Sequence, residues 1–173
     1  MDFGKRTRKQ LRNRKGSIAE FAPAMYFILI VGFFPMLDMI AVMLSYADCQ
    51  YLHFTLVRQA GLEQCLTLDT TTTPASLKPN YAFVTDPNGT FQSLITGWYN
   101  GVGHFTTRSL ADITVTANID VTQGTPTLKY VTINTTVVCN PLVPIPFPYQ
   151  VPGLSAPVTF SMSGNSVIEY VPS

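Results

Sequence analysis

The 173-residue chain has a net charge of only +1 at neutral pH, but its charges are distributed very unevenly. Residues 1–17 carry seven basic and one acidic side chains, a net charge of +6, whereas residues 18–173 carry four basic and nine acidic ones, a net charge of −5. Because nucleic-acid binding requires a face rich in Lys and Arg, the acidic remainder argues against a nucleic-acid partner.

The chain begins with a basic cluster that runs directly into an apolar segment. The cluster consists of Lys5, Arg6, Arg8, Lys9, Arg12, Arg14 and Lys15. Basic residues beside a membrane-spanning helix stay on the cytoplasmic side, and each attracts anionic lipid headgroups by about 1 kcal/mol. We therefore expect residues 1–16 to form a basic cytoplasmic leader that contacts membrane lipid, and the rest of the chain to face the other compartment.

The apolar segment is long enough to cross a bilayer. Residues 21–37 carry no charge, and residues 39–44 continue the apolar run beyond Asp38. The run thus reaches the roughly 20 residues that a membrane span needs. A signal peptide has a shorter apolar core, usually about 7–15 residues, which ends at a small-residue cleavage site. The sequence therefore favours a retained membrane helix over a signal peptide.

The same helix is expected to continue outside the membrane. The pattern from Ala19 to about Gln64 predicts one helix of about 45 residues, roughly 68 Å long. Its outer half mixes apolar and polar residues as amphipathic helices do, so its apolar stripe should pack on the exported part. Pro35 lacks a backbone donor and should disturb the helix within the membrane. We assign residues 17–66 to this transmembrane and amphipathic helix.

About 110 residues remain after the helix, the size of one small domain. Residues 67–111, which include four consecutive threonines and several turn-forming prolines and glycines, are interpreted as a linker and loops. Within them, residues 91–103 are interpreted as a short helix or strand that closes in a glycine turn.

Residues 112–173 are predicted to form a small antiparallel β domain. Alternating apolar and polar residues from Ile113 onward indicate a half-buried strand. Further strands are expected at 130–139 and 158–163, with another candidate at 167–171 after a turn at Gly164-Asn165. Residues 141–157 contain six prolines and should form a surface loop, because proline fits neither a helix interior nor a central strand.

Three cysteines in an exported chain suggest one disulfide with one thiol left over. Cys49 and Cys65 would lie about 24 Å apart on the expected helix, too far for a disulfide. A bridge between Cys65 at the helix end and Cys139 at a strand end is plausible and would tie the helix to the sheet. The alternative is three reduced, buried thiols.

The sequence contains no recognisable catalytic or metal-binding arrangement. His53 and His104 have no Cys, Asp or Glu at zinc-ligand spacing beside them, and Ser109 has no nearby histidine to activate it. The glycines at 101 and 103 lack the third glycine of a dinucleotide-binding loop. We expect a non-enzymatic protein without a metal or cofactor.

Residues 14–22, Arg-Lys-Gly-Ser-Ile-Ala-Glu-Phe-Ala, resemble the N-terminal segment of the TadE-like minor pilins, or pseudopilins, of bacterial tight-adherence systems. The C-terminal part is more loosely similar, with a strand such as 130–138, a proline-interrupted stretch such as 141–147 and a closing strand such as 158–162. The resemblance implies a pilin-like α+β fold, in which a long N-terminal helix, transmembrane plus extension, packs on a small antiparallel β domain.

The resemblance also implies processing and assembly roles for individual residues. A prepilin peptidase would cut between Gly16 and Ser17, and Glu20 and Phe21 would then serve assembly. Glu20 would pair with the freed N-terminal amine of an adjacent subunit; the other interpretation is a helix cap at the level of the headgroups. The family usually places this glutamate fifth after the cut, whereas Glu20 is fourth counted from Ser17, so an uncut chain remains an alternative.

Asp38 has two interpretations. An ionisable residue within a membrane span is by default a functional hypothesis, so Asp38 would contact a partner helix in the assembly machinery. Alternatively, the span lies closer to the N-terminus and Asp38 is hydrated at the outer interface.

We expect a minor pilin or pseudopilin that takes part in assembling a tight-adherence pilus or related secretion filament. It would reside in the bacterial inner membrane or in a pilus, with its N-terminus cytoplasmic and its C-terminal domain periplasmic or extracellular. Its partners would be other pilins and pilus-assembly membrane proteins. The alternative is an uncleaved single-span membrane protein whose exported β domain binds a ligand or partner.

Overall fold

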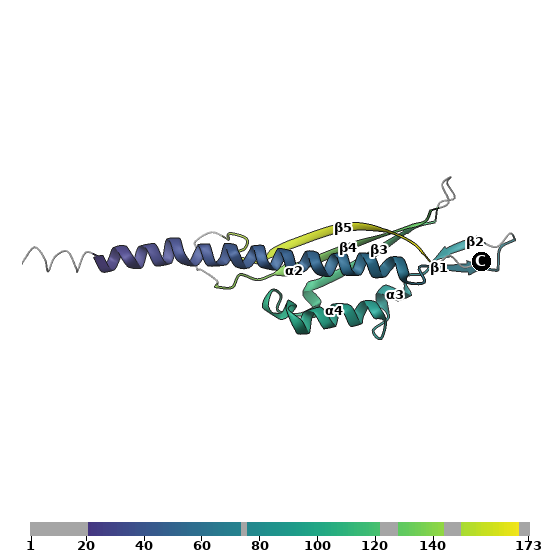
Figure 1. Cartoon of the computed structure of the whole chain (residues 1–173), viewed down its shortest axis with the longest axis horizontal. Coiled ribbons are helices and arrows are strands. Elements are labelled where there is room, and N and C mark those ends of the chain that lie inside the picture. Colours follow the sequence, from purple (N-terminus) through teal and green to yellow (C-terminus); the bar gives the residue numbers. More distant parts are fainter. Residues whose placement is uncertain (1–20, 74–75, 122–127, 144–149, 170–173) are drawn as a thin grey trace, which may run out of the picture.

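The computed structural model describes residues 21–73, 76–121, 128–143 and 150–169. A long helix extends from one end, a three-stranded sheet and shorter helices lie along its second half, and a two-stranded sheet lies beyond its far end (Figure 1). This is the expected α+β architecture. The elements in chain order are η1 (Leu29–Phe33), α2 (Phe34–Leu62), β1 (Leu66–Asp69), β2 (Ser76–Pro79), α3 (Ala82–Thr85), α4 (Thr90–Gly101), η2 (Gly103–Phe105), η3 (Leu110–Asp112), β3 (Ile113–Asp120), β4 (Tyr130–Cys139) and β5 (Val158–Val167).

The long helix runs without interruption from Phe21 to Leu62, which is 42 residues. Residues 21–28 are α-helical, and η1 is a wider π-helical stretch in which the N–H of Phe34 bonds to the carbonyl of Leu29, five residues back. Pro35 follows directly. Because a proline ring clashes with the carbonyl four residues before it, a wider turn relieves the crowding. Pro35 thus disturbs the helix where the sequence predicted.

The main sheet is an antiparallel meander with the strand order β3-β4-β5, as expected. The predicted turn at Gly164-Asn165 is wrong, because β5 continues through it to Val167. Gly164 pairs with Ile133 and Asn165 with Thr132, so the ten-residue β4 offers these residues ladder partners along its whole length. The candidate strand at 167–171 is therefore not a separate strand in its described part.

Residues 67–111 are not a linker. β1 and β2 pair as an antiparallel hairpin, and α3 and α4 follow. Phe91, Ile95 and Trp98 are buried on one face of α4, at the spacing that places side chains on one side of a helix. Residues 91–103 were expected to form either a short helix or a strand, and the helix α4 is what forms there.

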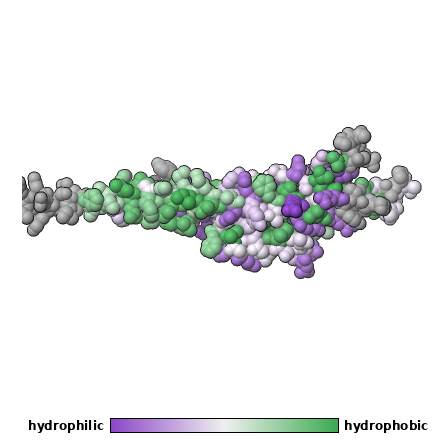
Figure 2. Space-filling model, in the orientation of Figure 1, coloured by the Kyte–Doolittle hydropathy of each residue, from purple (hydrophilic) through white to green (hydrophobic). Residues whose placement is uncertain are grey.

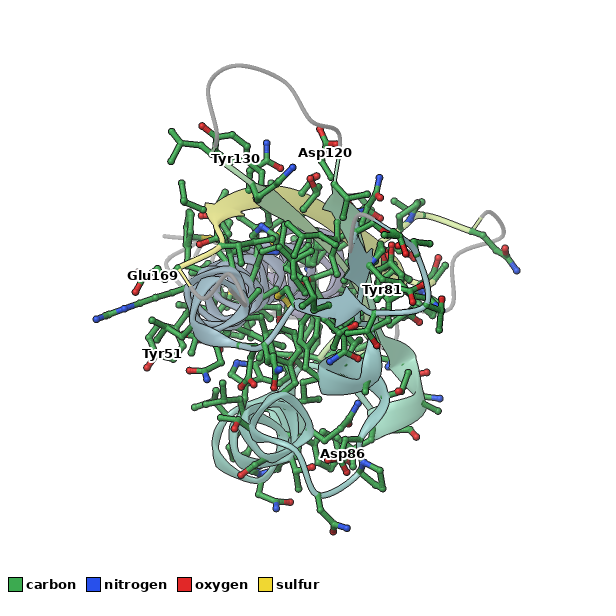
Figure 3. The ribbon with its side chains drawn as sticks, turned by 90° about the vertical axis from the view of Figure 1, so that its right-hand side faces the viewer. Tyr51, Tyr81, Asp86, Asp120, Tyr130 and Glu169 are labelled. Carbon is green, nitrogen blue, oxygen red and sulfur yellow. The ribbon has the colours of Figure 1, made fainter. Side chains whose placement is uncertain are left out.

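We call the second half of α2, together with the sheets and shorter helices, the head. Its core lies around α2, which is sandwiched between the main sheet and α4 (Figures 1 and 3). The inner face of β4 contributes Val131, Ile133 and Val137, all fully buried. From α2, Leu52 and Leu56 join the same core. The amphipathic half of the helix therefore packs on the β domain, as the sequence predicted.

Candidate functional site

The first half of the long helix, residues 21–44, presents an exposed apolar surface, and we call this segment the rod. Within the described residues, this helix is the one long and apolar enough to span a membrane, and only 6% of its most apolar window is buried. Figure 2 shows this apolar rod extending from a head of mixed polarity. Its exposed large side chains are Phe21, Met25, Tyr26, Phe27, Ile28, Leu29, Val31, Phe33, Met36, Met39, Ile40, Met43 and Leu44. A patch of this extent needs lipid or other protein to cover it.

The helix changes character where the head begins. Cys49, Leu52, Leu56 and Ala60 recur three or four positions apart and are at most 2% exposed. This spacing builds one apolar stripe along a helix. The bare half and the packed half are therefore continuous in one helix.

The proline-rich loop reaches back from the head along the rod, as its described parts beside the helix show in Figure 1. The N–H of Val143 donates a hydrogen bond of 2.9 Å to Oδ1 of Asp38. On the far side of the loop, Gly153 has a φ of 81°, and a Cβ there would lie only 2.9 Å from Cγ2 of Val42. The described parts of the loop thus form a collar on the helix between Asp38 and Val42.

Asp38 is fully buried beneath this collar, with an exposed fraction of 0%. Its second oxygen, Oδ2, is also buried and has no hydrogen-bond partner in the part of the chain that the structure describes. The folded chain therefore shields Asp38 from bulk solvent, whereas the second interpretation placed it in water at the outer interface. The contact with a partner helix stays a prediction, and the contact observed here is with the chain's own loop.

The other predicted assembly and processing residues lie at or before the start of the described chain. Phe21 is the first described residue of the helix and is 64% exposed. Gly16, Ser17 and Glu20 lie outside the described residues.

The cysteines are arranged differently from the expected pairing. Cys139 lies beside Cys49, with a sulfur–sulfur distance of 3.8 Å, and all three cysteines are free and buried. Cys65 instead donates its S–H to the carbonyl of Ala60 over 3.0 Å. The expected Cys65–Cys139 pair is therefore wrong, because β4 ends beside the middle of α2 and not beside its C-terminal end. All three thiols are buried, as the alternative of three reduced, buried thiols expected, and the close sulfur pair among them is Cys49 with Cys139.

Sequence analysis missed a groove between α2 and α4. It encloses about 270 Å³ and is lined by Tyr51, Leu52, Thr55, Ser93, Leu94, Gly97, Trp98, Gly101 and Val102. The indole N–H of Trp98 donates to the carbonyl of Asp48 at 3.2 Å and fastens α4 to α2. Tyr51 points away from the core at the rim (Figure 3). The helical spacing of Phe91, Ile95 and Trp98 was the signal that could have revealed this contact.

His53 contacts the sheet on another side of α2. Its Nδ1 lies 3.0 Å from Oγ1 of Thr135 in β4, and both side chains are buried. Within the described ranges, no group of three or more His, Cys, Asp and Glu side chains could hold a metal ion. This histidine therefore has an evident packing role, in which its ring nitrogen satisfies a buried hydroxyl.

The described residues thus combine a bare apolar rod, a collar on Asp38 and a head whose core includes the outer half of the same helix. One helix, Phe21–Leu62, could span a membrane by its length and composition. Comparisons with protein-family models, with curated proteins and with solved structures give no match.

Proposed function

We propose that this protein is a non-enzymatic, TadE-like minor pilin or pseudopilin that takes part in assembling a tight-adherence pilus or a related secretion filament. The observation that supports this best is the single 42-residue helix, apolar and bare in its first part and built into an antiparallel β head in its second. Such a subunit can exchange lipid for neighbouring helices around its rod without refolding its head.

The dimensions of the rod suit a membrane subunit with an exported head. The 17 residues from Phe21 to Leu37 extend about 26 Å as a helix, close to the roughly 30 Å of a bilayer core. The collar at Asp38 and Val42 would then lie at the outer membrane surface. The basic leader would stay in the cytoplasm, since basic flanking residues resist translocation.

Assembly would depend on close packing along the rod, because lipid supplies no hydrophobic drive between helices. Gly32 is open, with nothing within 4 Å of the position that a Cβ would take. Met36 and Met39 are 62% and 57% exposed nearby and can adapt to the surface of another helix. These features support other pilins and pilus-assembly membrane proteins as the partners of the rod.

The N-terminal mass of protein purified from its native host tests the processing step. We expect a chain that begins at Ser17, produced by a prepilin peptidase that cuts after Gly16. A Gly16→Val variant should retain the leader and disappear from sheared filament fractions. An intact leader on wild-type protein that is also absent from filaments would support the uncut single-span alternative and contradict the proposal.

Cross-linking tests the role of the rod directly. A photoreactive amino acid at Phe27 or Met36 should form adducts with other pilin-like subunits in cells that assemble filaments. The matched control is Asp86 on the head, which is exposed and far along the chain from the rod. Adducts with lipid alone from both rod positions would contradict the proposal.

The orientation of the head needs its own measurement. Protease added to intact spheroplasts should degrade the head and leave the leader. Protection of the head in spheroplasts, with digestion only after lysis, would place it in the cytoplasm and exclude a pilin role.

A further inference from the structure

Two buried thiols meet where the helix packs on the sheet. Cys49 belongs to α2 and Cys139 is the last residue of β4, and their sulfur atoms are 3.8 Å apart. Their exposed fractions are 0% and 1%. A disulfide has a sulfur–sulfur bond of about 2.0 Å, so a movement of less than about 2 Å would bring these atoms to bonding distance.

The third cysteine is held elsewhere. All three cysteines lie in the described residues, and Cys49 with Cys139 is the close sulfur pair among them. Cys65 follows the end of α2 and donates its S–H to the carbonyl of Ala60. Burial, with a smaller effect of the Glu63 carboxylate, raises the pKa of the Cys65 thiol to about 11. The hydrogen bond with Cys139, together with burial, raises the pKa of the Cys49 thiol further still, so proximity and not acidity distinguishes the Cys49–Cys139 pair from Cys65.

We propose that Cys49 and Cys139 are the disulfide pair of this protein and form their bond while the head folds in an oxidising compartment. The compartment rests on the export of the head in the proposed function, since such bonds persist in the periplasm and outside the cell. The pairing itself rests on the contact between α2 and β4.

The bond would form by thiol–disulfide exchange with a protein or small-molecule disulfide as the oxidant. One cysteine loses its proton, and its thiolate attacks a donor sulfur and expels the other donor sulfur as a thiolate. The second cysteine then loses its proton and attacks the mixed disulfide. Cys49 and Cys139 become joined and the donor is left as two thiols.

The burial of both thiols sets the order of these events. Because neither sulfur is accessible in the folded chain, the donor must react before α2 docks fully on the sheet. Docking then brings the second thiol to the mixed disulfide.

The position of the bond indicates what it does. Cys139 directly precedes the proline-rich loop, and Asn140 next to it bonds through its N–H to the carbonyl of Thr106 at 3.0 Å. Cys49 lies eleven residues, or about 16 Å of helix, beyond Asp38. The bond would therefore fasten the end of the head nearest the rod. A pulling force on the head would then be transmitted to the helix through a covalent link, which would hold even if the side chains of the core separated.

Peptide mapping of the full chain tests the pairing. The protein is purified from its native host with N-ethylmaleimide present during lysis and denaturation, and is then digested without reduction. We expect one linked peptide pair that contains Cys49 and Cys139, lighter by two hydrogens than its reduced parts, with Cys65 carrying the maleimide. The link should be absent from Cys49→Ser and retained in the matched control Cys65→Ser.

Thermal unfolding adds a second readout. Reduction should lower the unfolding midpoint of Cys65→Ser by on the order of 10 °C, because the link closes a long loop, and should leave that of Cys49→Ser unchanged. A link that involves Cys65 would overturn the proposal. So would three maleimide-modified thiols that persist after the denatured chain is refolded with oxidised glutathione.

One further outcome separates this inference from the proposed function. If the native protein carries three free thiols but refolding with oxidised glutathione joins Cys49 to Cys139, the pairing is supported. The same result would show that the head does not fold in an oxidising compartment, which counts against its export.

Discussion

Oδ1 of Asp38 accepts a hydrogen bond of 2.9 Å from the backbone N–H of Val143, a residue 105 positions later in the chain. This contact ties the proline-rich loop to the helix at the boundary between the bare rod and the head. The other carboxylate oxygen is buried without a hydrogen-bond partner in the described chain, which costs free energy. Stability alone therefore does not explain a buried carboxylate here, whereas its position as the point that holds the loop on the helix does.

Replacing Asp38 should release the loop. Asp38→Ala leaves the Val143 N–H without its acceptor, whereas Asp38→Asn keeps an acceptor oxygen. We expect the alanine variant to be about 1–3 kcal/mol less stable than the asparagine variant, the usual penalty for an unpaired buried polar group. Unfolding in detergent, followed by the fluorescence of the single tryptophan, Trp98, measures the difference.

The control for this prediction is Met39→Ala, because Met39 is the next residue and is 57% exposed. It should change stability by no more than about 0.5 kcal/mol. The Val143 amide should also exchange hydrogen faster in Asp38→Ala. Equal stability and equal exchange in the alanine and asparagine variants would show that the contact does not hold the loop.

Gly164 allows the helix to approach the sheet. A Cβ at this position would lie 2.8 Å from Nε2 of His53 and 2.9 Å from Cγ2 of Val57, both on α2. Gly164→Ala should therefore destabilise the head by about 1–3 kcal/mol through overpacking. Gly97→Ala is the matched control, because a Cβ there meets nothing within 4 Å. In the middle of α4 it should stabilise the head by about 0.5–1 kcal/mol, and denaturant titration would reveal the opposite signs.

Trp98 fastens α4 to the long helix. Trp98→Phe keeps an aromatic ring but removes the hydrogen bond to the carbonyl of Asp48 and leaves a small void. A loss of about 1–3 kcal/mol is expected, measured by circular dichroism because the fluorophore is gone. Thr96→Ala, at an exposed position of the same helix, should change stability by less than about 0.5 kcal/mol. Equal losses in the two variants would exclude this anchoring role.

Asp69 at the end of β1 makes the β1–β2 hairpin sensitive to acid. Hydrogen bonds from the hydroxyl and the N–H of Thr71 lower the pKa of Asp69 below its ordinary 3.8. Because the folded pKa is the lower one, the stabilisation is complete above pH 3.8 and is lost as the pH falls through the folded value.

Removing the hydroxyl donor should raise this pKa. Thr71→Ala should move the Asp69 pKa towards 3.8, as carboxyl-detected NMR titration would show. Thr72→Ala is the control, since the Thr72 hydroxyl bonds the Asp69 backbone carbonyl and not the carboxylate. A shift of the same size in both variants would mean that the hydroxyl of Thr71 is not the cause.

Much of the architecture could be predicted because it depends on local patterns. The apolar run and the later apolar stripe indicated one long helix, and alternation indicated β3 and β4. The hairpin of β1 and β2 was missed, because its strands are only four residues long and flank a threonine-rich turn. The turn at Gly164-Asn165 was predicted from its residues alone, whereas pairing with β4 keeps that segment extended.

The amino-acid order by itself determined the charge of the N-terminal segment, the apolar rod and the alternating strands, because each depends on residues a few positions apart. Only the tertiary structure decided which cysteine meets Cys139 and what covers Asp38. These contacts join residues 90 and 105 positions apart. Their geometry depends on how the sheet lies along the helix and on where the proline-rich loop returns, and no local spacing encodes either.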